Sequence, residues 1–268
     1  MTSLLTRTLR DPSLAGRWSP AQWAALVPQA RTTRLLATLC QLAGGIEGGQ
    51  SIPPEVWRHL SSGWTSHRKQ CADLNYEVQK VGAALVEAGE ELVVLKGAAY
   101  ILAGLEAAGG RMISDIDILV REEKLPAVEA ALARHGWSAG NIHPYDERYY
   151  RQWMHEIPPL GHRQRQSVLD VHHTILPPTS DGTVDARALW EATVEVAPGV
   201  RVLGPGDMVL HSATHLFHEG EFHQGLRDLL DLDRLLRQFA REYGDDFYRQ
   251  LIERARYMGL TVPLYYAL

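Results

Sequence analysis

The stretch Ser114-Asp115-Ile116-Asp117-Ile118-Leu119-Val120 joins two aspartates to an apolar run. Side chains alternate along an extended chain, so the carboxylates of Asp115 and Asp117 point to one face and reach the same small volume. Two negative charges this close repel each other unless a cation lies between them. Mg²⁺ or Mn²⁺ suits such oxygen ligands and leaves positions for water and phosphate. The stretch predicts a strand over residues 116–120 that carries a divalent-metal site. Two solvated aspartates at a strand end are the alternative.

The residues before this stretch predict a phosphate-binding turn. Residues 92–95 form a short apolar, β-branched run typical of a buried strand, and Lys96 and Gly97 follow at once. Glycine at a strand-to-helix turn lets backbone N–H groups approach a phosphate, and Lys96 adds a positive charge. An ordinary junction between a strand and a helix would also favour glycine.

Arg111 offers a second cation between this turn and the aspartates. A guanidinium neutralises phosphate charge through planar two-point contacts, so Arg111 is a candidate triphosphate ligand. The alternative is that Arg111 pairs with Asp115 or Glu106 and shapes the loop.

A third carboxylate follows on a later apolar run, residues 168–172, where Asp170 and His172 share one face of the expected strand. A neighbouring strand would bring Asp170 beside Asp115 and Asp117, although Asp170 could instead pair with a nearby arginine. Because the aspartates should repel each other, we expect Asp117→Asn to leave the stability of the metal-free protein unchanged or slightly higher.

The alternation of strands and helices over residues 92–172 predicts an α/β (α+β) core with a mixed sheet. We expect an N-terminal helical region over residues 1–90, the core over 91–200 and a C-terminal helical region over 201–268. The segment from Pro177 past Pro205 is expected to be irregular. The last residues, 262–268, have the pattern of an unfinished helix, which leaves open whether the natural chain extends past Leu268.

Composition limits the classes of function. The 268 residues are 45% hydrophobic, enough for a sizeable core, and the net charge of −5 argues mildly against binding long nucleic acids. Cys40 and Cys71 have no CxxC spacing, so no zinc or redox motif is indicated. Residues 92–105, the most apolar stretch, are too short to span a bilayer, and residues 1–16 do not resemble a secretory signal. We expect a cytoplasmic protein.

Two polar patterns in the C-terminal region have competing interpretations. His211, His215 and His218 share one helix face. A zinc cluster is conceivable, but we favour a polar face that covers the active-site side or pairs with Glu219. Residues 227–234 include three aspartates and two arginines and are expected to form a solvated helix face with internal ion pairs.

With these motifs in order, the sequence resembles nucleotidyltransferases of the DNA polymerase β-like superfamily. Those proteins carry a glycine turn after a first strand, an aspartate pair at the next strand and a third acidic residue on a later strand. More narrowly, the chain resembles a group of largely uncharacterised bacterial nucleotidyltransferases with a hydrophobic–LKG turn, an R-x-x-S-D-I-D-x-L-V motif and a DxH strand. The matching residues here are 94–97, 111–120 and 170–172. The resemblance covers residues 92–173 well and 227–236 weakly.

The resemblance implies an enzyme that moves a nucleoside monophosphate from an NTP such as ATP to an acceptor hydroxyl and releases pyrophosphate. Asp115, Asp117 and Asp170 would be catalytic and hold Mg²⁺ or Mn²⁺. Nucleotide contacts would come from five further residues: Lys96, Gly97, Arg111, Ser114 and His172. The sequence does not specify the nucleotide, the acceptor or the oligomeric state. The acidic balance favours a small-molecule or protein acceptor over a nucleic acid.

Two other functions remain open. Ala98 stands where the superfamily usually has serine or glycine after the first glycine, so a degenerate protein that binds a nucleotide or a partner without turnover is one alternative. A metal-dependent phosphohydrolase is the other. It would use Asp170, His172 and His173 with the helix that carries His215.

Overall fold

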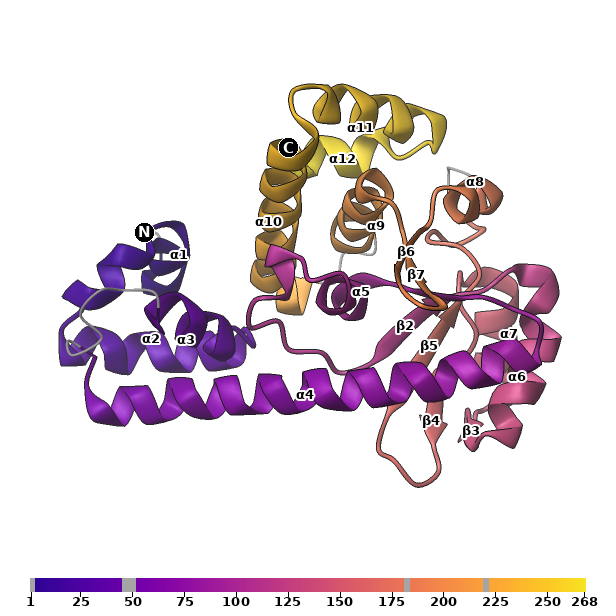
Figure 1. Ribbon diagram of the computed structural model, residues 1–268, viewed down its shortest axis with the longest axis horizontal. Coiled ribbons are helices and arrows are strands. Elements are labelled where there is room, and N and C mark those ends of the chain that lie inside the picture. Colours follow the sequence, from indigo (N-terminus) through magenta and orange to yellow (C-terminus); the bar gives the residue numbers. More distant parts are fainter. Residues whose placement is uncertain (1–2, 45–51, 181–183, 219–221) are drawn as a thin grey trace.

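The computed structural model describes residues 3–44, 52–180, 184–218 and 222–268. These residues form a mixed sheet with helices packed around it, as Figure 1 shows, so the predicted α/β class is confirmed. The strand order is β3-β4-β5-β2-β1-β7-β6. The strands are β1 (Leu92–Val94), β2 (Ile116–Leu119), β3 (Trp137–Ser138), β4 (Leu160–His162), β5 (Val168–His172), β6 (Val194–Ala197) and β7 (Val200–Val202).

The centre of the sheet positions the predicted site. β2 is antiparallel to β1 and parallel to β5, and all residues of β1 and β2 are buried. Strands buried on both faces read as continuous apolar runs, which is why 92–95 and 116–120 were recognisable from sequence.

The segment expected to be irregular contains regular structure instead. Helix α8 (Ala186–Glu191) and the hairpin of β6 and β7 lie there, and β7 pairs parallel with β1. The prediction failed because these strands are short and six of their seven residues are exposed or half-exposed, so no apolar run marks them.

The helices of the core and C-terminal part cover the sheet and close the fold. The buried Asp207 in α9 forms an ion pair with the half-buried Arg254 in α11, 2.7 Å between Oδ2 and Nη2. The elements are α5 (Lys96–Leu102), η3 (Glu106–Ala108), η4 (Glu122–Lys124), α6 (Leu125–Arg134), α7 (Pro144–Trp153), α9 (Pro205–Phe217), η5 (Phe222–Gln224), α10 (Gly225–Tyr243), α11 (Asp246–Tyr257) and α12 (Thr261–Ala267).

The N-terminal part is helical, as expected, and has its own apolar cluster. Its elements are α1 (Leu4–Arg10), η1 (Pro12–Arg17), α2 (Pro20–Thr32), α3 (Leu36–Gly44) and α4 (Pro54–Glu87). At 34 residues α4 is about 50 Å long, and it runs along the molecule beneath both parts in Figure 1. Val56 and Leu60 of α4 belong to the N-terminal cluster, whereas Leu74 and Val78 belong to the core. One stiff helix thus joins the two clusters.

A glycine pair fixes the N-terminal helices against the core. A Cβ at Gly110 would lie 2.3 Å from the backbone nitrogen of Thr38 in α3, and the φ of Gly110 is +74°. The hydroxyl of Thr38 also donates to the carbonyl oxygens of Gly109 and Gly110, each at 3.3 Å. The loop that leads to Arg111 and the aspartates is therefore held by α3.

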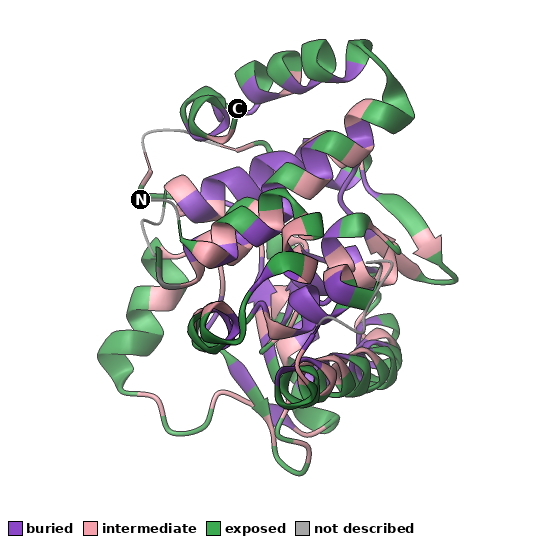
Figure 2. Cartoon of the chain, turned by 90° about the vertical axis from the view of Figure 1, so that its left-hand side faces the viewer, coloured by how far each residue is buried: buried purple, intermediate pink, exposed green. Residues whose placement is uncertain are grey.

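Figure 2 shows buried residues gathered on the central elements, while the helices at the periphery expose one face. Within the described ranges, no helix is both long and apolar enough to cross a membrane.

Candidate active site

Asp117 and Asp170 lie directly opposite each other on the neighbouring parallel strands β2 and β5. Such strands are about 4.8 Å apart, and residues in register point to the same face. Both aspartates line a pocket of about 380 Å³ together with Asp115, Lys96 and Gly97. The three predicted aspartates thus line one pocket, and that they share metal ions stays a prediction.

Asp117 is a compensated charge. The Nζ atom of Lys96 lies 2.8 Å from its Oδ1 atom, and Nε2 of His172 lies 3.1 Å from the same oxygen. Burial opposes ionisation of Asp117, but Lys96 and His172 outweigh it, so the pKa of Asp117 lies far below its ordinary value. The expectation that Asp117→Asn would relieve repulsion is therefore wrong, because the carboxylate has two partners that stabilise its charge.

Asp170 is the uncompensated carboxyl. Burial, followed by the charges of Asp117, Glu156 and Asp115, raises the pKa of Asp170 to about 8. Its Oδ1 atom is buried and has no hydrogen-bond partner in the described structure. A buried acceptor without a partner, beside other carboxylates, fits a cation ligand. The residues present thus suit a divalent metal.

Lys96 has an unusual backbone. Its φ of +48° lies in the left-handed region, which costs a non-glycine residue roughly 1–2 kcal/mol. The next residue, Gly97, packs under Arg111, since an added Cβ would lie 3.2 Å from its Cζ atom. Gly97 is therefore favoured by this close packing, and its backbone is also available for a phosphate.

Arg111 is almost fully buried at the rim of the pocket. Its Nε atom donates to Oδ2 of Asp231 at 2.6 Å, and its Nη2 atom lies 3.6 Å from Oδ1 of Asp228. These acids, rather than Asp115 or Glu106, are its partners. Both come from α10 and both are buried, so the expected solvated face is wrong for them.

The burial of Asp228 and Asp231 had a sequence signal. They recur at helical spacing with Leu232, Leu235 and Phe239, and all five residues are buried in α10. Aspartates inside an apolar stripe indicate buried partners.

Glu156 is a pocket residue that sequence reasoning missed. It follows α7, and its Oε2 atom lies 3.2 Å from Nε2 of His172. Among the described residues, only His155, Glu156 and His172 offer metal-ligand atoms all within 4.8 Å of one another. No motif marks Glu156, because its position depends on how the loop folds back onto β5.

The remaining predicted residues lie in different environments. His172 is fully buried behind Asp117, whereas Ser114 is exposed and its hydroxyl donates to Oδ2 of Asp115 at 3.1 Å. His211 is buried, and its ring centroid lies 6.3 Å from that of His172. Burial, then the charge of Lys96, holds the pKa of His211 well below its ordinary value.

The helix face with three histidines borders the pocket without forming a shared metal centre within the described residues. His215 lines the pocket, and Nε2 of His218 lies 2.9 Å from the hydroxyl of Ser180. Glu219, the acidic neighbour considered from sequence, lies outside the described residues.

The chain matches a known protein family. A family model described as "Uncharacterised nucleotidyltransferase" matches residues 19–268. Among solved structures, the chain is similar to the antibiotic-resistance factor ANT(2'')-Ia, with 15% identity and a TM-score of 0.42. That similarity covers 74% of this chain and 96% of the other. No curated protein matches the chain. The family match extends beyond the sheet to α2, α3 and α4.

Proposed function

Since this chain belongs to the family of uncharacterised nucleotidyltransferases, we propose that it moves a nucleoside monophosphate from an NTP, such as ATP, to an acceptor hydroxyl and releases pyrophosphate. The observation that carries the proposal is the pairing of Asp117 with Asp170 across β2 and β5, in a pocket that also holds Asp115 and Lys96. The net charge of −5 favours a small-molecule or protein acceptor over a nucleic acid.

Asp115, Asp117 and Asp170 would hold the divalent metal, Mg²⁺ or Mn²⁺, which when bound supplies Lewis-acid activation of the phosphate. Lys96 and Arg111 would neutralise charge on the triphosphate, with the backbone of Gly97 beside them. Ser114, exposed at the pocket rim, would add a hydroxyl contact.

Asp170 would act as the proton acceptor. Its buried Oδ1 atom has no hydrogen-bond partner among the described residues, so this oxygen is available to a hydroxyl proton. The acceptor oxygen attacks the α-phosphorus, the bond from that phosphorus to the oxygen bridging to the β-phosphate breaks, and pyrophosphate leaves. The hydroxyl proton passes to Asp170.

His172 would be a positioning residue rather than a nucleotide ligand. It is buried, and its Nε2 atom lies within 3.2 Å of both Oδ1 of Asp117 and Oε2 of Glu156. It therefore fixes the orientation of the Asp117 carboxylate.

The phosphohydrolase alternative has less support. Its proposed residues are divided, because Asp170 and His215 line the carboxylate pocket while His173 lines a separate one with Trp190. The cluster of His155, Glu156 and His172 is the observation in its favour.

The test is incubation of the purified protein with each labelled NTP, Mg²⁺ or Mn²⁺ and a cell extract, followed by a search for a labelled product. Asp117→Asn should abolish labelling, and Asp233→Asn, which changes an exposed aspartate of α10, should leave it intact. Absence of product with every NTP would favour the degenerate alternative. Tightly bound stoichiometric zinc or manganese, with phosphate release, would favour the hydrolase.

A further inference from the structure

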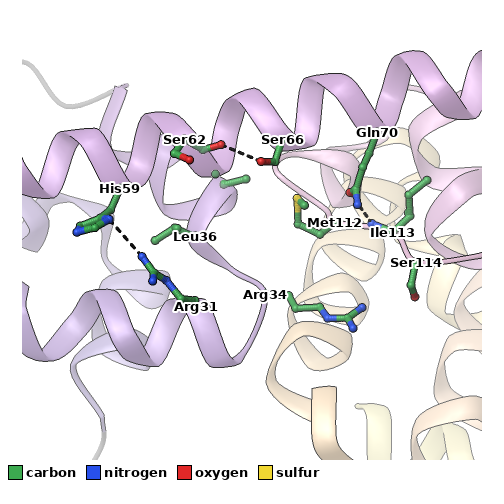
Figure 3. Close-up of a pocket in the computed structure, with 12 residues that line it drawn as sticks. Arg31, Arg34, Leu36, His59, Ser62, Ser66, Gln70, Met112, Ile113 and Ser114 are labelled. Carbon is green, nitrogen blue, oxygen red and sulfur yellow. Dashed lines mark hydrogen bonds between the residues drawn. The ribbon is translucent and has the colours of Figure 1, made fainter. Parts of the chain in front are cut away.

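A second pocket, of about 570 Å³, adjoins the carboxylate pocket. It lies between the α2–α3 turn, α4 and the loop before the aspartates, and it is drawn in Figure 3. Ile113 and Ser114 line both pockets, and Ser114 directly precedes Asp115. A molecule in the second pocket therefore lies beside the residue that precedes Asp115.

The charge of this pocket is opposite to that of the chain. Arg31 and Arg34 line it, and no aspartate or glutamate does so among the described residues. Nη2 of Arg31 lies 3.2 Å from Nδ1 of His59, as Figure 3 shows, and within the described ranges neither arginine has a carboxylate partner. In a protein of net charge −5, two such cations in one pocket indicate an anionic ligand.

The backbone of Arg34 gives independent support. Arg34 follows the end of α2 with a φ of +56°, a position that normally favours glycine. Arg34 and Lys96 are the two non-glycine residues with positive φ in the described chain, and each lines one of the adjoining pockets. Residues held in strained conformations cluster at functional sites, and here the strained position presents a guanidinium to the pocket.

The walls of the pocket are fixed by direct contacts. Gln70 of α4 accepts a hydrogen bond from the backbone nitrogen of Ile113 at 3.2 Å, and Nδ1 of His67 donates to the carbonyl of Arg111 at 3.0 Å. Gly63 lets α3 approach α4 closely, since an added Cβ would lie 3.1 Å from Cγ of Leu36. The pocket is thus held between two helices and an anchored loop.

We propose that this basic pocket binds an anionic group of the acceptor, a phosphate monoester or a carboxylate, while the acceptor hydroxyl lies at Asp170. The inference rests on the proposed transfer reaction and names the class of its acceptor. The nucleotide occupies the carboxylate pocket, where Lys96 and Gly97 lie, and the acceptor extends into it past Ser114, which lines both pockets.

The test is calorimetric titration of the nucleotide-free protein with glycerol 3-phosphate, malate and glycerol, and separately with Mg–ATP. Arg31→Gln and Arg34→Gly should each weaken binding of the favoured anion about tenfold, because each removes a charge-assisted contact. Arg34→Gly should fold at least as well as the parent, since glycine suits its backbone. Arg58→Gln, at an exposed position of α4 outside the pocket, is the matched control and should change binding less than twofold.

The two anions distinguish a phosphate from a carboxylate, and glycerol should not bind. The proposal is overturned if neither anion binds the parent protein, or if both arginine variants bind the anion as tightly as the parent protein does. It is also overturned if the two variants weaken Mg–ATP binding by the same factor as anion binding. Failure of the parent protein to bind ATP or any other NTP with Mg²⁺ would instead contradict the proposed transfer reaction, while the anion titration would still report on this pocket.

Discussion

Asp117 and Asp170 are the same residue type in register on neighbouring strands, yet their carboxyls ionise very differently. Asp117 has Lys96 and His172 beside it, whereas at Asp170 burial and the charges of Asp117, Glu156 and Asp115 outweigh the effect of Lys96. When the surroundings of two carboxyl groups give them very different pKa values, the two groups take different chemical roles. Here one is a permanent charge and the other exchanges a proton near neutral pH.

Asp170→Asn should reduce the loss of stability that the metal-free protein shows between pH 5 and pH 8. In the unfolded chain this carboxyl ionises near pH 4, but in the folded protein its pKa is about 8, so folding binds a proton and stability falls as pH rises between these values. The variant lacks this loss. Its melting temperature relative to the parent should therefore be higher at pH 8 than at pH 5. An equal difference at both pH values would contradict the raised pKa.

Asp117→Asn should destabilise the protein at neutral pH by about 3 kcal/mol, because Lys96 and His172 lose a buried partner. The pKa of Asp117 is depressed, so its contribution is present above the unfolded value and is lost as pH falls towards the folded one. Denaturant unfolding at pH 7 and pH 3 measures the effect, and the deficit should shrink at pH 3. A variant as stable as the parent at pH 7 would show that the contacts of Asp117 with Lys96 and His172 do not contribute to stability.

Arg111→Ala should lower stability by about 3–5 kcal/mol, since Asp228 and Asp231 would remain buried without it. Arg111→Lys should retain only part of the stability that Arg111→Ala loses, because an ammonium lacks the planar two-point geometry of a guanidinium. Melting curves and Mg–ATP titrations on the same proteins separate the two roles of Arg111. If Arg111 contacts the triphosphate, its loss should also weaken Mg–ATP binding about tenfold. Unchanged affinity for Mg–ATP would mean that Arg111 has only a structural role.

The site residues differed in how far sequence could locate them. Asp117 and Asp170 lie on strands whose period of two fixes which face each side chain takes, and Asp115 directly precedes β2. That all three line one pocket was therefore predictable. Glu156 and the partners of Arg111 depend on loop conformation and on how α10 packs, and neither follows from local periodicity. Local sequence patterns show which face of a strand or helix a side chain takes. Contacts between distant elements can be located only once the fold is known.

At the scale of elements, the sheet was predicted where strands are buried and missed where they are not. β1, β2 and β5 are apolar runs, whereas β6 is mostly exposed and β3 has two residues. The docking of α3 on the loop at Gly110 was also not predictable, since two glycines mark a turn but not its neighbour.

Gly110→Ala should be strongly destabilising, and Gly104→Ala is its matched control. Both glycines have positive φ, but a Cβ at Gly104 meets nothing within 4 Å, whereas one at Gly110 meets the backbone of Thr38. Gly104→Ala should cost only the backbone strain, about 1 kcal/mol, and Gly110→Ala about 1–3 kcal/mol more. Denaturant unfolding compares the two variants. Equal losses of stability would mean that α3 moves to accommodate the added Cβ at Gly110 with no loss of free energy of unfolding.

At the scale of the molecule, two apolar clusters share one long helix, so the N-terminal cluster should be able to loosen alone. Leu60 is fully buried in that cluster, and Leu60→Ala should cost about 2–5 kcal/mol there. Hydrogen exchange should then accelerate in α2 and α3, while β2 and β5 remain protected. A uniform acceleration across the sheet would show instead that the clusters unfold as one unit.

Helix α4 gives the molecule a property that neither pocket has by itself. It carries His59 and Ser66 along the basic pocket and, one turn further on, Gln70, which holds the loop in front of Asp115. A helix of this kind does not stretch, so the distance between His59 and Gln70 along α4 is constant. His59 contacts Arg31, and Gln70 binds the backbone of Ile113, so α4 ties the basic pocket to the loop before Asp115 at a set separation. We expect the enzyme to act as a molecular ruler: among anionic acceptors it should select by length, rejecting those whose hydroxyl lies too near or too far from the charged end.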